Sequence, residues 1–243
     1  MSPLIIEETN LTTAWQTALR TVIQSPGKEV TPLLLSLTDF QETVPFRNVL
    51  DEHLKNGGRA SIQTVSETIF PASLYKFCKN DRHELYEEYK ANLPRIRKLD
   101  AKNRRGTYFE RLIAYNGKIN QLEIIISSYQ HDSGVRRSKL QASIFDASKD
   151  HTNSPYQGFP CLQHVTFYAT QDKGLILNSF YAIQYLYERA YGNWLGLINL
   201  GKFMASELGL TFERFNCYIG VEQLDHLTKV QAQDLLKQAN NQG

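Results

Sequence analysis

The sequence predicts one α/β domain, and three observations carry that prediction. The chain has 243 residues, of which 42% are hydrophobic, enough to bury a large core. Segments with helical spacing of apolar residues alternate with short runs rich in β-branched and aromatic residues. No internal repeat or low-complexity linker divides the chain. We therefore expect residues 1–243 to form a single domain in which helices pack on a β-sheet.

In the first part of the chain, the spacing of apolar residues predicts a helix followed by a strand. Four apolar residues recur at four-residue spacing and predict an amphipathic helix over 11–24: Leu11, Trp15, Leu19 and Ile23. The apolar run 30–40 is bounded by turn formers, so we expect the first strand of the main sheet there. Residues 61–77 read as a strand or the start of a helix that is broken at Pro71. Residues 81–93 predict a polar helix that ends before Pro94.

Helices and strands alternate in the second half of the chain. The spacing of apolar residues predicts helices over 119–130, 193–210 and 228–239. Alternation and β-branched or aromatic content predict strands over 138–146, 161–170 and 212–225, and the run 174–188 is again apolar and aromatic. Turn formers over 152–160 predict a loop. Cys161 is therefore expected where a strand begins at the mouth of that loop.

Charge and cysteine content exclude several classes of protein. The 27 Lys+Arg residues nearly balance the 25 Asp+Glu residues, so bulk electrostatics do not favour a nucleic-acid or acidic-membrane partner. The basic stretch 95–105 reads first as a solvated loop. Three widely spaced cysteines without a CxxC pair indicate neither a disulfide framework nor a zinc site. Without a signal peptide or a long apolar span, a cytoplasmic protein is expected.

A lone cysteine in such a protein is usually a small buried hydrophobic residue, so only its context can indicate a functional role for Cys161. The chain carries an ordered series of polar and aromatic positions around it: Glu67, the doublet Arg136-Arg137, the segment Gly158-Phe159-Pro160-Cys161, the pair Phe167-Tyr168, and Gly192-Asn193. This order resembles the thymidylate synthase and pyrimidine hydroxymethylase superfamily over about residues 10–228. The resemblance implies an α/β (α+β) fold with a mixed sheet packed with helices, and a sheet face that forms a homodimer interface.

The resemblance also implies roles for these residues. The Cys161 thiolate would add to C6 of a pyrimidine ring, so that C5 can accept a one-carbon unit from 5,10-methylenetetrahydrofolate. Arg136 and Arg137 would lower the pKa of that thiol and bind a phosphate across the dimer. Glu67 would act as general acid and base, and the Asn193 amide would pair with the ring edge. Each residue also has an alternative without a functional role. Arg136-Arg137 could be a polar turn, Glu67 a solvated glutamate, and Asn193 a helix N-cap.

The pocket departs from the family pattern. The family's phosphate-binding and base-holding positions fall on Ala182, Ile183 and Tyr185, and its sugar-binding His-x-Tyr falls on Gln223 and Asp225. The sequence also ends soon after 228–239, where the family continues into a segment that closes over folate. Losing charged partners from a phosphate site costs on the order of 2–5 kcal/mol, which disfavours ordinary deoxyuridylate methylation.

Two hypotheses from different classes follow. The first is a methyl- or hydroxymethyltransferase that uses a Cys161 adduct on a different small-molecule substrate, such as a nucleotide or nucleoside. The alternative is a non-catalytic ligand-binding or structural homodimer on the same scaffold. A thiol hydrolase that pairs Cys161 with His164 is disfavoured, because positions i and i+3 on a strand point to opposite faces.

Overall fold

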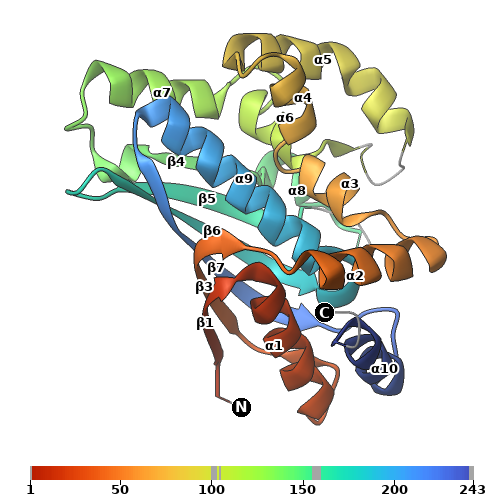
Figure 1. The fold of residues 1–243 in the computed structure, drawn as a ribbon. Helices are drawn as coiled ribbons and strands as arrows, with labels where there is room; N and C mark the ends of the chain where they lie inside the picture. The colour runs from red at the N-terminus through yellow and green to blue at the C-terminus, as the bar shows by residue number, and fades with distance from the viewer. Residues whose placement is uncertain (1, 100–102, 104, 155–159, 241–243) are drawn as a thin grey trace.

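Seven strands form one mixed sheet in a computed structural model that describes residues 2–99, 103, 105–154 and 160–240 (Figure 1). The strands are β1 (Leu4–Asn10), β2 (Glu29–Val30), β3 (Leu33–Gln41), β4 (Gln141–Ser143), β5 (Leu162–Ala169), β6 (Gly174–Tyr185) and β7 (Thr211–Gln223). Their order is β1-β3-β7-β6-β5-β4, with β2 paired to β7. Because β1 runs parallel to β3 and β6 parallel to β7, while the other pairs are antiparallel, the mixed α/β class is confirmed.

Helices cover one face of this sheet. They are α1 (Leu11–Gln24), α2 (Val44–Asn56), α3 (Ile62–Glu67), α4 (Ala72–Phe77), α5 (Arg82–Leu99), α6 (Tyr108–Ile113), α7 (Gln121–His131), α8 (Ala147–Asp150), α9 (Tyr191–Leu208) and α10 (Lys229–Asn240). A 3₁₀ turn, η2 (Arg137–Lys139), precedes β4, and a π-helix, η3 (Leu186–Ala190), joins β6 to α9. Helix α9 packs on β6 and β7, and α1 packs beside it on β1 and β3.

The strand patterns explain why only one face is covered. In β7, Phe215, Cys217 and Ile219 are buried toward the helices, whereas Tyr218 between them is 41% exposed on the opposite face. This alternation is the period of a strand with one face in the core. Helix α9 is buried around most of its circumference, because the sheet lies beneath it and α1, α3 and α7 pack around it.

Two glycines bring α9 close to α3. A Cβ at Gly192 would lie 2.6 Å from Val65 Cβ, and one at Gly196 would lie 2.7 Å from the Ser66 carbonyl oxygen. Any larger residue at either position would therefore push the two helices apart. This contact holds the first turn of α9 against α3.

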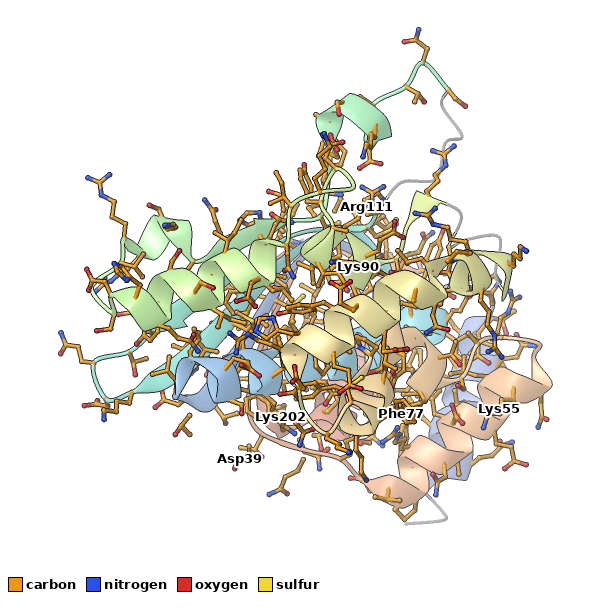
Figure 2. All side chains as sticks on the ribbon, turned by 90° about the horizontal axis from the view of Figure 1, so that it is seen from above. Asp39, Lys55, Phe77, Lys90, Arg111 and Lys202 are labelled. Carbon is orange, nitrogen blue, oxygen red and sulfur yellow. The ribbon has the colours of Figure 1, made fainter. Side chains whose placement is uncertain are left out.

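Charged side chains lie on the outside of the helical layer. Lys90 of α5, Lys55 of α2 and Lys202 of α9 are seen there when the molecule is viewed from above (Figure 2). No helix in the described ranges is both long enough and apolar enough to cross a membrane.

Several predicted elements need correction. The strand predicted over 30–40 is β3 and follows an earlier strand, β1, so it is not the first of the sheet. Helix α5 continues through Pro94 to Leu99. Pro94 lacks only one backbone donor, and Leu93 and Ile96 pack on the core, which holds the helix together across that position. The strand predicted over 138–146 is only the three-residue β4.

Candidate functional site

Cys161 lies immediately before β5 and is partly buried against the core. Its carbonyl oxygen accepts a hydrogen bond from the Ala182 amide at 3.1 Å, which fixes the cysteine beside β6. The preceding residues Gly158 and Phe159 lie outside the described residues. The predicted position at the start of a strand is therefore correct.

One charge that acts on the Cys161 thiol is not indicated by the sequence spacing. Burial raises the pKa of the Cys161 thiol above its usual value, and the Arg189 guanidinium partly opposes this shift. Arg189 belongs to η3, the π-helical turn in which the chain leaves β6. Turns of this kind occur often at functional sites.

The arginine doublet lies far from Cys161 of the same chain. Arg136 and Arg137 are exposed at η2, and the Arg137 guanidinium sits 5.0 Å from the centre of the Tyr168 ring. Tyr168 follows Cys161 by seven residues of extended chain, a span of about 23 Å at the rise of a strand. Within one chain this doublet therefore does not activate the thiol.

Glu67 ends α3 and is engaged by the neighbouring helix. Its Oε1 accepts hydrogen bonds from the Ser73 amide at 3.1 Å, from Ser73 Oγ at 2.7 Å and from Gln63 Nε2 at 2.6 Å. These contacts tie α3 to the first turn of α4, which is the behaviour of a helix-capping carboxylate.

Asn193 has the surroundings of a recognition residue. It is 4% exposed in the first turn of α9, and its side chain forms no hydrogen bond with any residue in the described part of the chain. The alternative that Asn193 caps the helix is wrong, because the N-cap position is Ala190. A nearly buried amide without a protein partner is a group that ligands or water satisfy.

The two predicted sugar-binding positions differ from each other. Gln223 is half-buried at the end of β7. Asp225 instead holds η3, because its carboxylate accepts hydrogen bonds from the Tyr187 amide at 2.9 Å and the Glu188 amide at 3.2 Å. Burial raises the pKa of Asp225, and those two amides oppose the shift.

Glu188, Asp225 and His226 approach one another closely, with ligand-type atoms within 4.8 Å. Arg59 Nη2 lies 3.1 Å from His226 Nδ1, and since a guanidinium only donates, Nδ1 must accept. The ring proton is then on Nε2 and is donated to Glu188 at 2.9 Å. Arg189 binds the other oxygen of Glu188 at 3.0 Å. This cluster is a hydrogen-bonded ion network that fixes Arg189, and it does not favour a metal ion.

Deeper in the fold lie three polar side chains with unpaired atoms. Both oxygens of Glu222, Nε2 of Gln184 and the Tyr181 hydroxyl are enclosed and lack hydrogen-bond partners in the described structure. Gln184 and Glu222 are opposite each other on β6 and β7, and Trp194 Nε1 donates to the Gln184 oxygen at 2.9 Å. Tyr181 pairs with Leu162, the residue after Cys161. Tyr181 and Gln184 therefore lie on β6, the strand next to Cys161, and Glu222 lies on β7, one strand further away.

His164 does not contact Cys161. Its ring lies 3.0 Å from Gln141 and 3.4 Å from Ser143, both on β4. A cysteine–histidine pair is therefore not formed.

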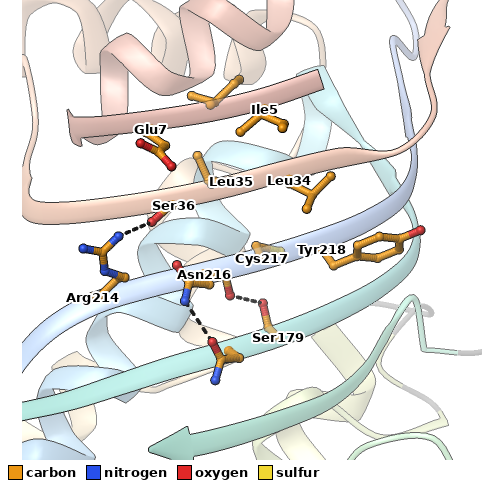
Figure 3. A pocket seen from close by; sticks show the side chains of 12 residues that line it. Ile5, Glu7, Leu34, Leu35, Ser36, Ser179, Arg214, Asn216, Cys217 and Tyr218 are labelled. Atoms are coloured by element: carbon orange, nitrogen blue, oxygen red, sulfur yellow. Dashed lines mark hydrogen bonds between the residues drawn. The ribbon is translucent and has the colours of Figure 1, made fainter. Parts of the chain in front are cut away.

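The face of the sheet opposite the helices is uncovered by the described part of the chain. A row of apolar side chains crosses it from Ile5 through Leu34 and Tyr218 to Phe180, with the last two rings stacked 5.3 Å apart. A polar row runs beside it, in which Asn216 donates to Asn178 and Asn178 donates to Thr166. A shallow hollow of about 420 Å³ lies on this face. Figure 3 shows side chains that line it, among them Arg214, which donates a hydrogen bond to Ser36.

No protein-family model matches the sequence, and no curated protein matches it either.

Proposed function

We propose that this protein is a homodimeric transferase in which Cys161 adds to a uracil-like or other electron-poor ring and so activates it for one-carbon transfer or related carbon–carbon chemistry. The substrate is a small molecule other than deoxyuridylate. The carrying observation is the surroundings of Cys161: a partly buried thiol within the electrostatic reach of Arg189, with unpaired polar groups on the strands β6 and β7.

The chemistry of these groups supports covalent catalysis. Arg189 supplies positive charge to a developing thiolate, which is the active nucleophile of a cysteine. The unpaired Asn193 amide offers one donor and one acceptor, the complement of the edge of a uracil-like ring. The lost phosphate-binding positions are consistent with a substrate other than an ordinary monophosphate.

Two features support a dimer built on the uncovered sheet face. The apolar row Ile5, Leu34, Tyr218 and Phe180 is too continuous for an ordinary solvated surface. Arg137 lies over Tyr168, at the opposite end of β5 from Cys161. A second copy related by a twofold axis across this face would bring its Arg137 toward the partner's thiol.

The one-carbon donor in this proposal is 5,10-methylenetetrahydrofolate. Its support is the resemblance of residue order. A thermal-shift screen of pyrimidine nucleosides, nucleotides and reduced folates tests it, because a ligand at a hundred times its Kd adds about 2.7 kcal/mol of stability.

Intact-protein mass spectrometry provides the decisive measurement. Incubation with a ligand found by the screen should add that ligand's mass to the wild-type chain and not to Cys161→Ser. A ligand that stabilises both chains equally without adding mass would contradict the transferase.

That outcome would favour the second candidate, a ligand-binding or structural homodimer on the same scaffold. One observation supports this alternative: burial raises the pKa of Cys161, whereas an activated nucleophile needs a lowered pKa. The dimer face is common to both candidates.

A further inference from the structure

The side chain of Arg189 is the last member of a series of hydrogen bonds that starts far away in the sequence. Arg59 Nη2 donates to His226 Nδ1 at 3.1 Å, and His226 Nε2 donates to Glu188 Oε2 at 2.9 Å. Arg189 Nη2 donates to the other oxygen of Glu188 at 3.0 Å. The loop between α2 and α3, the turn after β7 and the π-helix η3 are thus joined through their side chains.

His226 links the two ends of this series and uses both nitrogens of its ring. A neutral imidazole with its proton on Nε2 can accept from Arg59 and donate to Glu188 at the same time, whereas a charged imidazole has no acceptor. The Asp225 carboxylate lies 3.7 Å from the same Nε2, which also favours the proton there. The ring therefore passes the orientation of one side chain on to the next without carrying a charge.

The backbone at His226 is unusual. Its φ of 53° lies in the left-handed region, which residues other than glycine adopt rarely and only where the surroundings hold them. Leu224 and Leu227 supply that hold, because both are buried on either side of the turn. The strained residue of this turn is thus the one that joins Arg59 to Glu188.

The same turn also fixes the backbone of η3. Asp225 accepts hydrogen bonds from the Tyr187 amide at 2.9 Å and the Glu188 amide at 3.2 Å. Glu188 is 4% exposed, so its carboxylate has little freedom to exchange its protein partners for water. Both the backbone and the side chain of Glu188 are consequently set by residues 225 and 226.

The charge of Arg189 acts on the neighbourhood of Cys161. Burial raises the pKa values of the Cys161 thiol and the Tyr108 hydroxyl, and in both cases the Arg189 guanidinium opposes the rise. A Coulomb interaction weakens with distance, so the effect on the thiol depends on where the guanidinium is held.

We propose that His226 and Arg59 are positioning residues for the Cys161 site. They orient the Glu188 carboxylate, which in turn holds the guanidinium of Arg189 where its charge favours the thiolate. This inference rests on the proposed function and adds two residues to its site that the order of residues along the chain does not indicate.

The alkylation of Cys161 by iodoacetamide, measured across pH by mass spectrometry, tests this role. His226→Leu should move the midpoint of the rate profile upward and slow alkylation at neutral pH several-fold, and by no more than Arg189→Gln does. The substitution replaces a neutral ring, so it removes no charge that could act on the thiol directly. Arg59→Gln, the second variant, should change the profile in the same direction and by less, because His226 can still donate to Glu188.

His226→Gln is the conservative variant. Its amide offers one acceptor for Arg59 and one donor for Glu188, and its backbone bears the same left-handed conformation as the leucine variant. The midpoint should therefore return toward that of the unchanged chain in His226→Gln. Equal midpoints in the leucine and glutamine variants would overturn the inference, because the hydrogen bonds would then have no effect on the thiol.

A mutant cycle shows whether the effect passes through Arg189. In a chain that already carries Arg189→Gln, neither His226→Leu nor Arg59→Gln should move the midpoint further. A further shift would overturn the inference, since the two residues would then act on Cys161 by another route. The control is Arg47→Gln, a partly buried arginine of α2 that binds Glu42, and it should leave the midpoint unchanged.

The failure of the inference differs from the failure of the proposed function. If Cys161 of the unchanged chain reacts no faster than Cys78 and Cys217, the proposed function is overturned, and the inference with it. If Cys161 reacts faster but its midpoint stays in place in His226→Leu and Arg59→Gln, only the inference is overturned. Nitrogen NMR of the His226 ring gives a readout without alkylation: the tautomer protonated at Nε2 is expected at slightly alkaline pH, and the tautomer protonated at Nδ1 would contradict the inference.

Discussion

Gln184 and Glu222 lie opposite each other on neighbouring parallel strands, and both keep buried side-chain atoms without hydrogen-bond partners in the described structure. Polar groups in this state cost free energy of folding, typically about 1–3 kcal/mol each. Both residues are buried in the interior and not at the protein surface, so no solvent offsets this cost.

This pair predicts an unusual dependence of stability on pH. The pKa of Glu222 is raised in the folded chain, so its contribution to stability is fully present below the unfolded pKa and is lost as pH rises through the folded pKa. In that window the loss is about 1.4 kcal/mol per pH unit. Glu222→Gln should flatten the fall of Tm with rising pH and raise Tm at neutral pH. Calorimetry from acidic to neutral pH tests this, and parallel curves would contradict it.

Arg189 should control the reactivity of Cys161. Replacing it in Arg189→Gln removes the charge that opposes the effect of burial, so the thiol pKa should rise further and alkylation at neutral pH should slow several-fold. Rates measured across pH should show the midpoint moving upward. The exposed Arg20→Gln on α1 is the control, and an equal change there would exclude a local effect.

The uncovered sheet face should hold two copies together. Tyr218→Asp places a charge in the apolar row and should shift the protein to a monomer in sedimentation equilibrium. Phe77→Asp is the matched control, because Phe77 is 75% exposed on α4, in the helical layer. A monomeric unchanged chain, or dissociation by both substitutions, would be evidence against this interface.

Arg137 should act on the partner's Cys161. Alkylation of Cys161 should be slow in the Arg137→Ala chain and should partly recover when that chain is mixed with a Cys161→Ala chain, whose Arg137 is intact. Recovery should be absent when Tyr218→Asp is present in both chains. Mass spectrometry of the mixed sample measures the modified fraction of each chain.

The close contact between α3 and α9 should be sensitive to one methyl group. A Cβ at Gly196 would lie 2.7 Å from the Ser66 carbonyl oxygen and 2.9 Å from Ile69 Cβ, so Gly196→Ala should cost about 1–3 kcal/mol. That corresponds to roughly 2–4 °C in Tm for each kcal/mol. Gly27→Ala meets nothing nearer than 4.0 Å and should leave Tm nearly unchanged.

The elements with strong periodicity could be predicted from the sequence. The helix over 11–24 matches α1 at both ends, and the extended runs 161–170 and 212–225 match β5 and β7 closely. The failures have physical reasons. Strand β1 is short and half polar because it lies at the sheet edge, and α5 passes through Pro94 because tertiary contacts outweigh a missing hydrogen bond.

The candidate site was less accessible to prediction. Cys161 was found because of its neighbours along the chain, but Arg189 reaches it only because a π-helix intervenes between β6 and α9. Glu222 had one local signal, a carboxyl group directly after a run of apolar residues within a strand. Its lack of partners depends on packing between strands that are distant in sequence, which residue spacing does not encode.

The two rows on the uncovered face restrict how any identical copy can sit on it. Neighbouring rows on one face of a strand are two residues apart, about 6.6 Å. If one copy were displaced by that distance relative to the other, amide groups would lie against aromatic rings. Hydrogen bonds would then be lost, and apolar surface would stay exposed to water. In the proposed dimer the face would thus accept one angular setting and one translation of its partner. Related chains with a different order of rows would be rejected, so assembly would discriminate between self and near relatives.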